Sequence, residues 1–331
     1  MRQHGGITLV SLILGVVLII VGCLGCSSET TDKTEVKMVF APYFNTWLAT
    51  YAITNDIVTS DEIDINIELS SQYNTQMLAG DFQIGAMSAS TFATATETSS
   101  IPFVALSTFV VHAGEEESRG VNILYTREDS DITSPADLVG KTVGIDRMTS
   151  SATTSFLATL EREYGITEDQ ITLVIKSHAI NIELLRQGEL DAAMLGGNVS
   201  VAAYVDPTLN ILWNLDHTFE AEHGVPFIPS LLVAQADYFE QNKEIAEEVL
   251  DMLIESRQYG QEHIEEIVAE YAAEYGGDAD LYLNVFHNHS GTAFNLIEGD
   301  IEDTIMAIFE MVQERGIITE IPDPEVVFAK W

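Results

Sequence analysis

The side chains best suited to binding a small molecule gather where an expected strand ends and the next helix begins. Directly after an apolar strand at residues 36–41, positions 42–47 read PYFNTW, which places three aromatic rings and one amide within six residues. Aromatic rings can stack on a ligand, and an amide can hydrogen-bond to it. We therefore predict that Tyr43, Phe44, Asn45 and Trp47 bind ligand. The alternative for Phe44 and Trp47 is a core position in the following helix.

Hydroxyl groups mark a second junction of this kind. After the buried strand expected at residues 82–87, the chain reads SAST from residue 88, where a helix is expected to begin. A helix N-terminus carries roughly half a positive charge and free N–H groups, so it can hold an anion without a basic side chain. Ser88, Ser90 and Thr91 are accordingly predicted to bind ligand. The alternative for Ser88 is an ordinary N-cap.

A basic side chain accompanies the third junction. Residues 147–151 read RMTSS and lie between an expected strand at 141–145 and an expected helix at 151–164. Arginine forms paired hydrogen bonds with carboxylate, phosphate and similar oxyanions. Because Lys and Arg together number only 14 in the chain, this placement is informative. Arg147, Thr149, Ser150 and Ser151 are predicted to bind ligand, and the alternative for Arg147 is a surface ion pair.

Two further loops complete the set of candidates. Residues 196–198 read GGN, a permissive turn followed by an amide that could hydrogen-bond a ligand. Residues 224–227 read GVPF and lie at the start of an expected strand, where an aromatic ring could close one side of a cleft. Asn198 and Phe227 are therefore added to the predicted ligand-binding residues.

The sequence contains no arrangement of residues that is typical of catalysis or of metal binding. Both cysteines, Cys23 and Cys26, lie near the N-terminus, which excludes a Cys nucleophile or a Cys-based zinc site from the rest of the chain. His287 and His289 have no third ligand at a recognised spacing. We therefore predict a binding protein without metal or cofactor. The 52 Asp and Glu residues, with a net charge of -38, exclude nucleic acid as a partner.

Short apolar runs alternate with amphipathic stretches, which predicts an α/β fold with mostly parallel sheets flanked by helices. The chain of 331 residues is too long for one simple core, yet no Pro/Gly-rich linker divides it. We therefore predict two lobes, with the chain crossing between them near residues 126–134 and 215–226. Lobe 1 would comprise residues 36–125 plus 216–331, and lobe 2 residues 126–215.

The N-terminal segment has the composition of an export signal. Arg2 precedes a mainly apolar run at residues 7–21, which is shorter than the ~20 residues of a membrane span and fits the ~7–15 of a signal-peptide core. Residues 20–23 (IVGC) resemble the lipobox of bacterial and archaeal lipoproteins. This resemblance implies that residues 1–22 are a cleaved signal peptide and that Cys23 is lipidated, with Cys26 as the alternative. Residues 23–35 would then hold the lipidated cysteine and a polar tether.

Three motifs in order along the chain resemble those of periplasmic-type solute-binding proteins. Residues 76–85 (QMLAGDFQIG) resemble their helix–Gly–Asp–strand unit, residues 134–144 (SPADLVGKTVG) the segment that opens their second lobe, and residues 184–193 (LLRQGELDAA) a second Gly–acid–strand unit. The acidic helices after Tyr238 resemble the family's C-terminal helices. The resemblance covers roughly residues 36–275 and is greatest to the branch that binds nitrate, sulfonates, taurine or the thiamine pyrimidine precursor.

This resemblance implies a type II two-lobed periplasmic-binding-protein fold with a cleft between the lobes. It further implies a lipid-anchored receptor on the outer side of the cytoplasmic membrane. Such a receptor closes on a small organic anion (sulfonate, taurine or nitrate-like) or a pyrimidine-type solute and delivers it to an ABC permease and its ATPase. We expect a monomer. Two alternatives stay open: a sensory or scavenging lipoprotein without a transport role, and a pyrimidine-precursor enzyme on the same fold, whose Cys-rich motif this chain lacks.

Overall fold

The structure is a computed structural model that describes residues 33–112, 122–288 and 291–331, without the side chains of residues 198, 201 and 285–288. Lys33–Trp331 form one compact unit. The predicted signal peptide, Cys23, Cys26 and the predicted tether up to residue 32 lie outside the described residues, as do the imidazoles of His287 and His289. Among the helices in the described ranges, none has both the length and the apolar character needed to cross a membrane.

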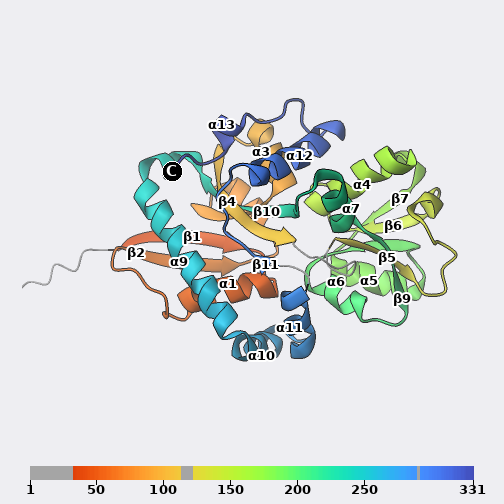
Figure 1. Cartoon of the computed structure of the whole chain (residues 1–331), viewed down its shortest axis with the longest axis horizontal. Helices are drawn as coiled ribbons and strands as arrows, with labels where there is room; N and C mark the ends of the chain where they lie inside the picture. Colours follow the sequence, from red (N-terminus) through yellow and green to blue (C-terminus); the bar gives the residue numbers. More distant parts are fainter. Residues whose placement is uncertain (1–32, 113–121, 289–290) are drawn as a thin grey trace, which may run out of the picture. The chain divides into compact units, whose positions relative to one another are not determined.

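The first lobe is built on a six-stranded sheet in the order β11-β4-β10-β3-β1-β2. Its strands are β1 (Thr34–Phe40), β2 (Ile63–Leu69), β3 (Ile84–Ser88), β4 (Phe103–His112), β10 (Phe227–Gln235) and β11 (Gly291–Thr292). Its helices are α1 (Phe44–Thr54), α2 (Tyr73–Ala79), α3 (Ala89–Thr98), α8 (Ala236–Gln241), α9 (Lys243–Glu262), α10 (Ile264–Tyr275), α11 (Ala279–Asn288), α12 (Asp300–Glu314) and α13 (Pro324–Val327). Figure 1 shows α3, α12 and α13 on one side of this sheet and α1, α10 and α11 on the other.

The second lobe is built on a five-stranded sheet in the order β7-β6-β8-β5-β9. Its strands are β5 (Ile123–Arg127), β6 (Thr142–Ile145), β7 (Thr172–Ile175), β8 (Ala192–Leu195) and β9 (Leu209–Asn214). Its helices are α4 (Ser151–Tyr164), α5 (His178–Gln187), α6 (Gly197–Tyr204) and α7 (Leu215–His223), with single 3-10 turns at Pro135–Leu138 and Glu168–Gln170. The predicted division at residues 125/126 falls inside β5, because the sequence of a strand does not tell which sheet the strand will join.

Both sheets are mixed, which corrects the expectation of mostly parallel sheets. In each sheet four strands share one direction, whereas β10 and β11 in the first sheet and β5 in the second run the opposite way. The first residue of β5, Ile123, pairs with Leu195 and Asn214, the last residues of β8 and β9. Strands β5 and β10 are reversed because each receives the chain from the other lobe. The carboxyl ends of the four strands that share one direction in each sheet therefore face the space between the lobes, where ligands bind in open α/β sheets.

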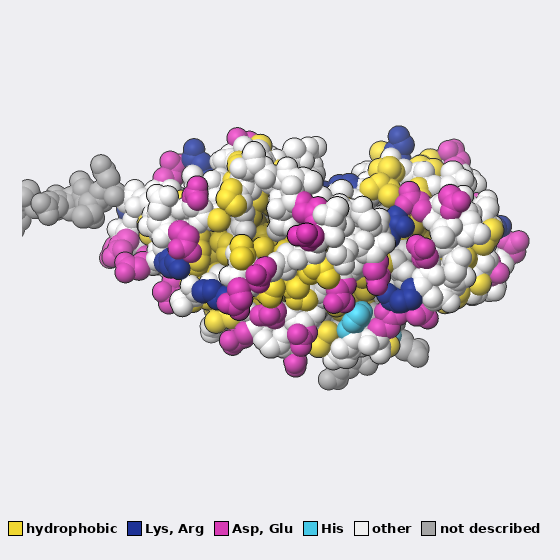
Figure 2. Space-filling view, turned by 90° about the horizontal axis from the view of Figure 1, so that it is seen from above, with side chains coloured by type: hydrophobic (Ala, Val, Ile, Leu, Met, Phe, Trp, Pro, Cys, Tyr) yellow, Lys and Arg dark blue, Asp and Glu magenta, His cyan; other side chains and the backbone are white. Residues whose placement is uncertain are grey.

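Apolar clusters support both lobes, and the first-lobe cluster also includes Ala158 of α4 and Phe219 of α7. In the second lobe, Leu124 of β5 packs into one cluster while its neighbours Ile123 and Tyr125 pack into another, on the opposite face of the sheet. Both faces are thus buried, which explains the continuous apolar runs of its strands. Figure 2 shows Asp and Glu side chains scattered over the face it displays, whereas Asp216 is buried.

Candidate functional site

A cavity of about 130 Å³ lies between the two lobes, at the carboxyl ends of their strands. A single buried water needs roughly 10–15 Å³ of such space, so the cavity has room for a small molecule. The first lobe contributes Ala41, Tyr43, Phe44, Asn45, Thr46, Tyr73, Ala86, Ser88, Phe109, Val110, Pro229, Ser230 and Tyr282. The second contributes Asn122, Asp146, Arg147, Ser150, Ser151, Ala152, His178, Gly196 and Gly197.

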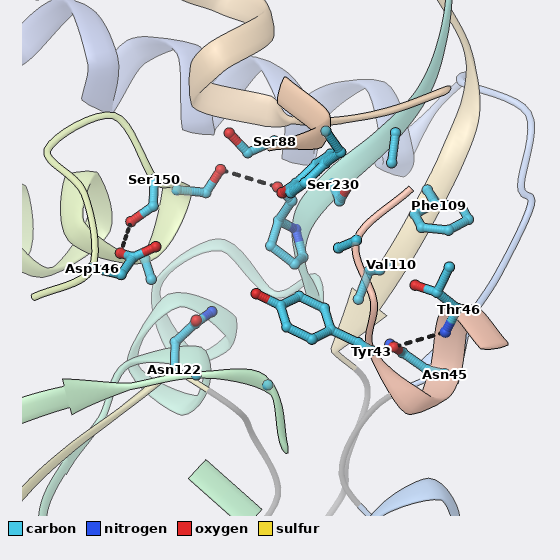
Figure 3. A pocket seen from close by; sticks show the side chains of 18 of the residues that line it. Tyr43, Asn45, Thr46, Ser88, Phe109, Val110, Asn122, Asp146, Ser150 and Ser230 are labelled. Carbon is cyan, nitrogen blue, oxygen red and sulfur yellow. Dashed lines mark hydrogen bonds between the residues drawn. The ribbon is translucent and has the colours of Figure 1, made fainter. Parts of the chain in front are cut away.

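The start of α1 forms the first-lobe wall of the cavity. Tyr43 is the N-cap residue of α1, and Figure 3 shows its ring between Asp146 and Asn122 on one side and Val110 and Asn45 on the other. Burial is the main cause that raises the pKa of Tyr43 above its ordinary value, with a smaller contribution from Tyr73. The Tyr43 hydroxyl therefore stays protonated at neutral pH and can donate a hydrogen bond to a ligand oxygen.

The loop between β6 and α4 supplies a charged pair on the opposite wall. Arg147 Nε lies 3.2 Å from Asp146 Oδ2, and the guanidinium lies 5.9 Å from the centre of the Tyr73 ring in the other lobe. Ser150 caps α4 by accepting the Thr153 N–H, and its hydroxyl donates to Asp146 Oδ1 at 2.8 Å. The Arg147 guanidinium also hydrogen-bonds to Tyr73, and its remaining N–H donors can bind an oxyanion.

His178, the first residue of α5, lies next to the Asp146–Arg147 pair. Its Nε2 is 3.8 Å from Asp146 Oδ2, too long for a hydrogen bond. Burial lowers the pKa of His178, and it outweighs the opposing effect of Asp146. The imidazole is therefore neutral at neutral pH. We did not predict His178 or Asp146 from the sequence, although each follows an expected strand as the predicted residues do.

The N-termini of five helices, α1, α3, α4, α5 and α6, contribute residues to the cavity or adjoin it. Each brings a partial positive charge, so the backbone favours an anion in this space. Ser88 is the N-cap of α3 and accepts the Thr91 N–H at 3.3 Å, which is the alternative that the sequence left open. It also lines the cavity, so capping and ligand binding are compatible roles.

Four predicted hydroxyl residues also connect the lobes. Ser151 Oγ accepts the Ser90 N–H at 3.2 Å and donates to the Pro229 carbonyl at 3.1 Å, and both partners belong to the first lobe. Thr91 Oγ1 donates to the Thr149 carbonyl at 3.3 Å. Ser90, Thr91 and Thr149 are not among the cavity-lining residues, whereas Ser151 is. These contacts hold α4 of the second lobe against α3 and β10 of the first.

Three predicted residues lie elsewhere or are not described. Trp47 packs its ring against Tyr271 and Tyr275, with centroids 5.9 and 5.4 Å away, and is not among the lining residues. Phe227 is 1% exposed and packs against Phe219. Trp47 therefore packs as a core residue of α1, which is the alternative that the sequence left open. Phe44 packs against Tyr271 and also lines the cavity. The side chain of Asn198 is outside the described part of the chain.

Gly197 brings the second lobe close to Tyr43. A Cβ on Gly197 would lie 3.1 Å from Tyr43 Cε1, and its φ of +55° is one that side chains disfavour. We expect Gly197→Ala to weaken ligand affinity about tenfold, because separating the ring from α6 costs about 1–2 kcal/mol. Titration calorimetry measures this effect. Gly165 has a φ of +65° and open space around its Cβ position, so Gly165→Ala is a control for backbone strain alone. Equal ligand affinity of Gly197→Ala and Gly165→Ala would contradict the functional importance of the close contact between Gly197 and Tyr43.

No group of three or more His, Cys, Asp or Glu side chains placed to hold a metal is found within the described residues. The cavity offers hydrogen-bond donors, aromatic rings and one guanidinium that is paired with the Asp146 carboxylate. This combination suits noncovalent binding of a small organic anion.

Residues 52–254 match a protein-family model described as "ABC transporter, phosphonate, periplasmic substrate-binding protein". Among solved structures, the chain resembles the periplasmic aliphatic sulphonate binding protein SsuA of Escherichia coli, with a TM-score of 0.72, 15% identity, and coverage of 90% of this chain and 93% of that one. It also resembles the alkanesulfonate-binding protein SsuA of Xanthomonas axonopodis pv. citri bound to MOPS, with a TM-score of 0.71, 13% identity, and coverage of 89% and 96%. These structures confirm the predicted two-lobed periplasmic-binding-protein fold.

One curated relative is an enzyme. The 4,5-dihydroxyphthalate decarboxylase of Comamonas testosteroni is 32% identical over 94 residues, which is 28% of this chain and 27% of the decarboxylase. The match thus spans about a quarter of that enzyme's length and does not transfer its activity.

Proposed function

The chain belongs to the family of periplasmic substrate-binding proteins of phosphonate ABC transporters, and we propose that it captures a small organic oxyanion in the cavity between its lobes. The family is one of transport receptors and not of enzymes, in agreement with the sequence-based expectation. Binding would favour the closed arrangement of the lobes, because a ligand held by both lobes has a higher affinity for that arrangement than for an open one.

The observation that carries this proposal is the position of Arg147. Its guanidinium belongs to a cavity that also receives helix N-termini and the Tyr43 hydroxyl, so a sulfonate or phosphonate group would find donors from both lobes. The relatives named as sulphonate-binding proteins support a headgroup of this kind. The pyrimidine alternative stays open, because Trp47 packs away from the cavity but other aromatic rings line it, namely Tyr43, Phe44, Tyr73, Phe109 and Tyr282.

We further propose that Cys23, or alternatively Cys26, carries the lipid that anchors the mature protein outside the cytoplasmic membrane. The tether following it would let a monomeric receptor reach an ABC permease and its ATPase. A sensory or scavenging role uses the same binding site. Uptake of the ligand by cells with and without this gene separates transport from that alternative.

A ligand panel tests the proposed oxyanion. Thermal unfolding would be measured with alkanesulfonates, alkylphosphonates, taurine, nitrate and a pyrimidine, alongside native mass spectrometry of protein purified from its own host. We expect a sulfonate or phosphonate to raise the melting temperature by about 5 °C at a concentration 100 times its Kd. A rise in melting temperature with the pyrimidine alone would indicate a pyrimidine-type ligand in place of an oxyanion. Unchanged melting temperatures with all compounds would count against the proposed oxyanion binding.

A further inference from the structure

An acidic side chain occupies the cavity that we assign to an anion. Asp146 lines this cavity, and its side chain is 13% exposed. Its two oxygens are already contacted, Oδ1 by the Ser150 hydroxyl at 2.8 Å and Oδ2 by Arg147 Nε at 3.2 Å. Each carboxylate oxygen has two lone pairs, so Asp146 can accept a further hydrogen bond from a ligand.

The groups that face Asp146 come from four elements. Arg147 belongs to the same loop, Ser150 starts α4, His178 starts α5, and Tyr43 starts α1 in the other lobe. Tyr43 and Ser150 are neutral hydroxyls, and burial keeps His178 neutral at neutral pH by lowering its pKa. Among the described residues that line the cavity, Asp146 and Arg147 are thus the ones that carry a full charge, and their charges cancel.

Because the charges of Asp146 and Arg147 cancel, the cavity limits the net negative charge of the ligand that it can bind. A singly charged oxyanion gains the attraction of Arg147 and the helix N-termini, whose partial charges offset the repulsion from Asp146. A doubly charged oxyanion doubles the attraction and the repulsion alike, but the cost of removing it from water rises about fourfold, with the square of its charge. It also has no proton to donate to Asp146, so one of its oxygens would face a carboxylate oxygen. A phosphonate that retains one proton avoids this and can donate its P–OH to Asp146.

We propose that Asp146 is a charge-selecting residue: the cavity takes a singly charged oxyanion, either a sulfonate or a phosphonate carrying one proton, and discriminates against the doubly charged form. This inference rests on the proposed function. It also separates two ligand groups of similar size and shape, because a sulfonate stays singly charged while a phosphonate loses its second proton near neutral pH.

Matched ligands test the proposal on the whole chain. Calorimetry would compare ethanesulfonate with ethylphosphonate, and benzenesulfonate with phenylphosphonate, from about pH 7 to about pH 9, where His178 is neutral because burial lowers its pKa. We expect sulfonate affinity to be independent of pH. Phosphonate affinity should fall about tenfold per pH unit above the second pKa of the ligand, since only the protonated form binds. Absence of binding by every ligand would overturn the proposed function together with this inference.

Asp146→Asn keeps the shape of the side chain and removes its charge. We expect this variant to lose the pH dependence of phosphonate binding, while an exposed control, Asp129→Asn, retains it. Equal weakening for both ligand types with the pH dependence unchanged would show that Asp146 only supports the local fold. Phosphonate binding by the unmodified protein that strengthens or stays constant as pH rises would also overturn the proposal, while leaving the proposed function intact.

Discussion

Replacement of Arg147 by alanine is expected to weaken binding of the oxyanion about 100-fold. Two effects combine: the ligand loses hydrogen bonds to a charged donor, worth about 1.5–3 kcal/mol, and Asp146 remains in the cavity without its cation. The same change removes the cation from the face of the Tyr73 ring, a contact that joins the two lobes. Calorimetry with the ligand found by the panel measures the loss.

Two further variants separate these effects. Arg127 has a similar side-chain exposure, 32% against 38% for Arg147, but pairs with Asp129 away from the cavity, so Arg127→Ala should bind normally. The double variant Arg147→Ala with Asp146→Asn restores a neutral cavity and should recover part of the lost affinity. Unchanged affinity in Arg147→Ala would remove this side chain from the binding site.

The order of strands and helices could be predicted because apolar runs and amphipathic stretches differ in period. The pairing of strands could not. Residues 123–125 (ILY) are apolar and β-forming in either lobe, and only the folded chain shows that Ile123 of β5 lies between Leu195 and Asn214. Strand direction follows from the crossing of the chain, a property of the whole fold that no local pattern of residues encodes.

The sequence predicted which loops form the candidate site more accurately than which side chains line the cavity. Residues 43–45, 88 and 147–151 lie at strand–helix junctions, and most of them line the cavity. Trp47 lies farther into α1 than the N-cap residue Tyr43, and its ring packs against Tyr271 and Tyr275 of α10. Asp146 was not among the predicted residues. Its significance depends on His178 and Tyr43, which are distant in sequence and become its neighbours only in the folded chain.

Gly260 lies inside α9, where it permits close packing, although glycine often ends a helix. Glycine is the commonest residue just beyond a helix end. In the structure α9 continues through Gly260 to Glu262. Gly260 is buried against α1, where a Cβ would lie 2.3 Å from the Leu48 carbonyl oxygen. Glycine at this position therefore allows α9 and α1 to approach backbone to backbone.

Gly260→Ala is accordingly expected to lower the free energy of unfolding by about 3 kcal/mol, because neither backbone can yield easily. In an exposed helix the same change would stabilise by about 1 kcal/mol, so the sign itself tests the contact. Urea denaturation measures it, with exposed Glu255→Ala on the same helix as a control expected within about 0.5 kcal/mol of the parent. Since α1 carries Tyr43 and Asn45 at its start, a shift of α1 should also weaken ligand binding by the folded variant. A Gly260→Ala protein as stable as the parent would show that α1 and α9 do not pack this closely.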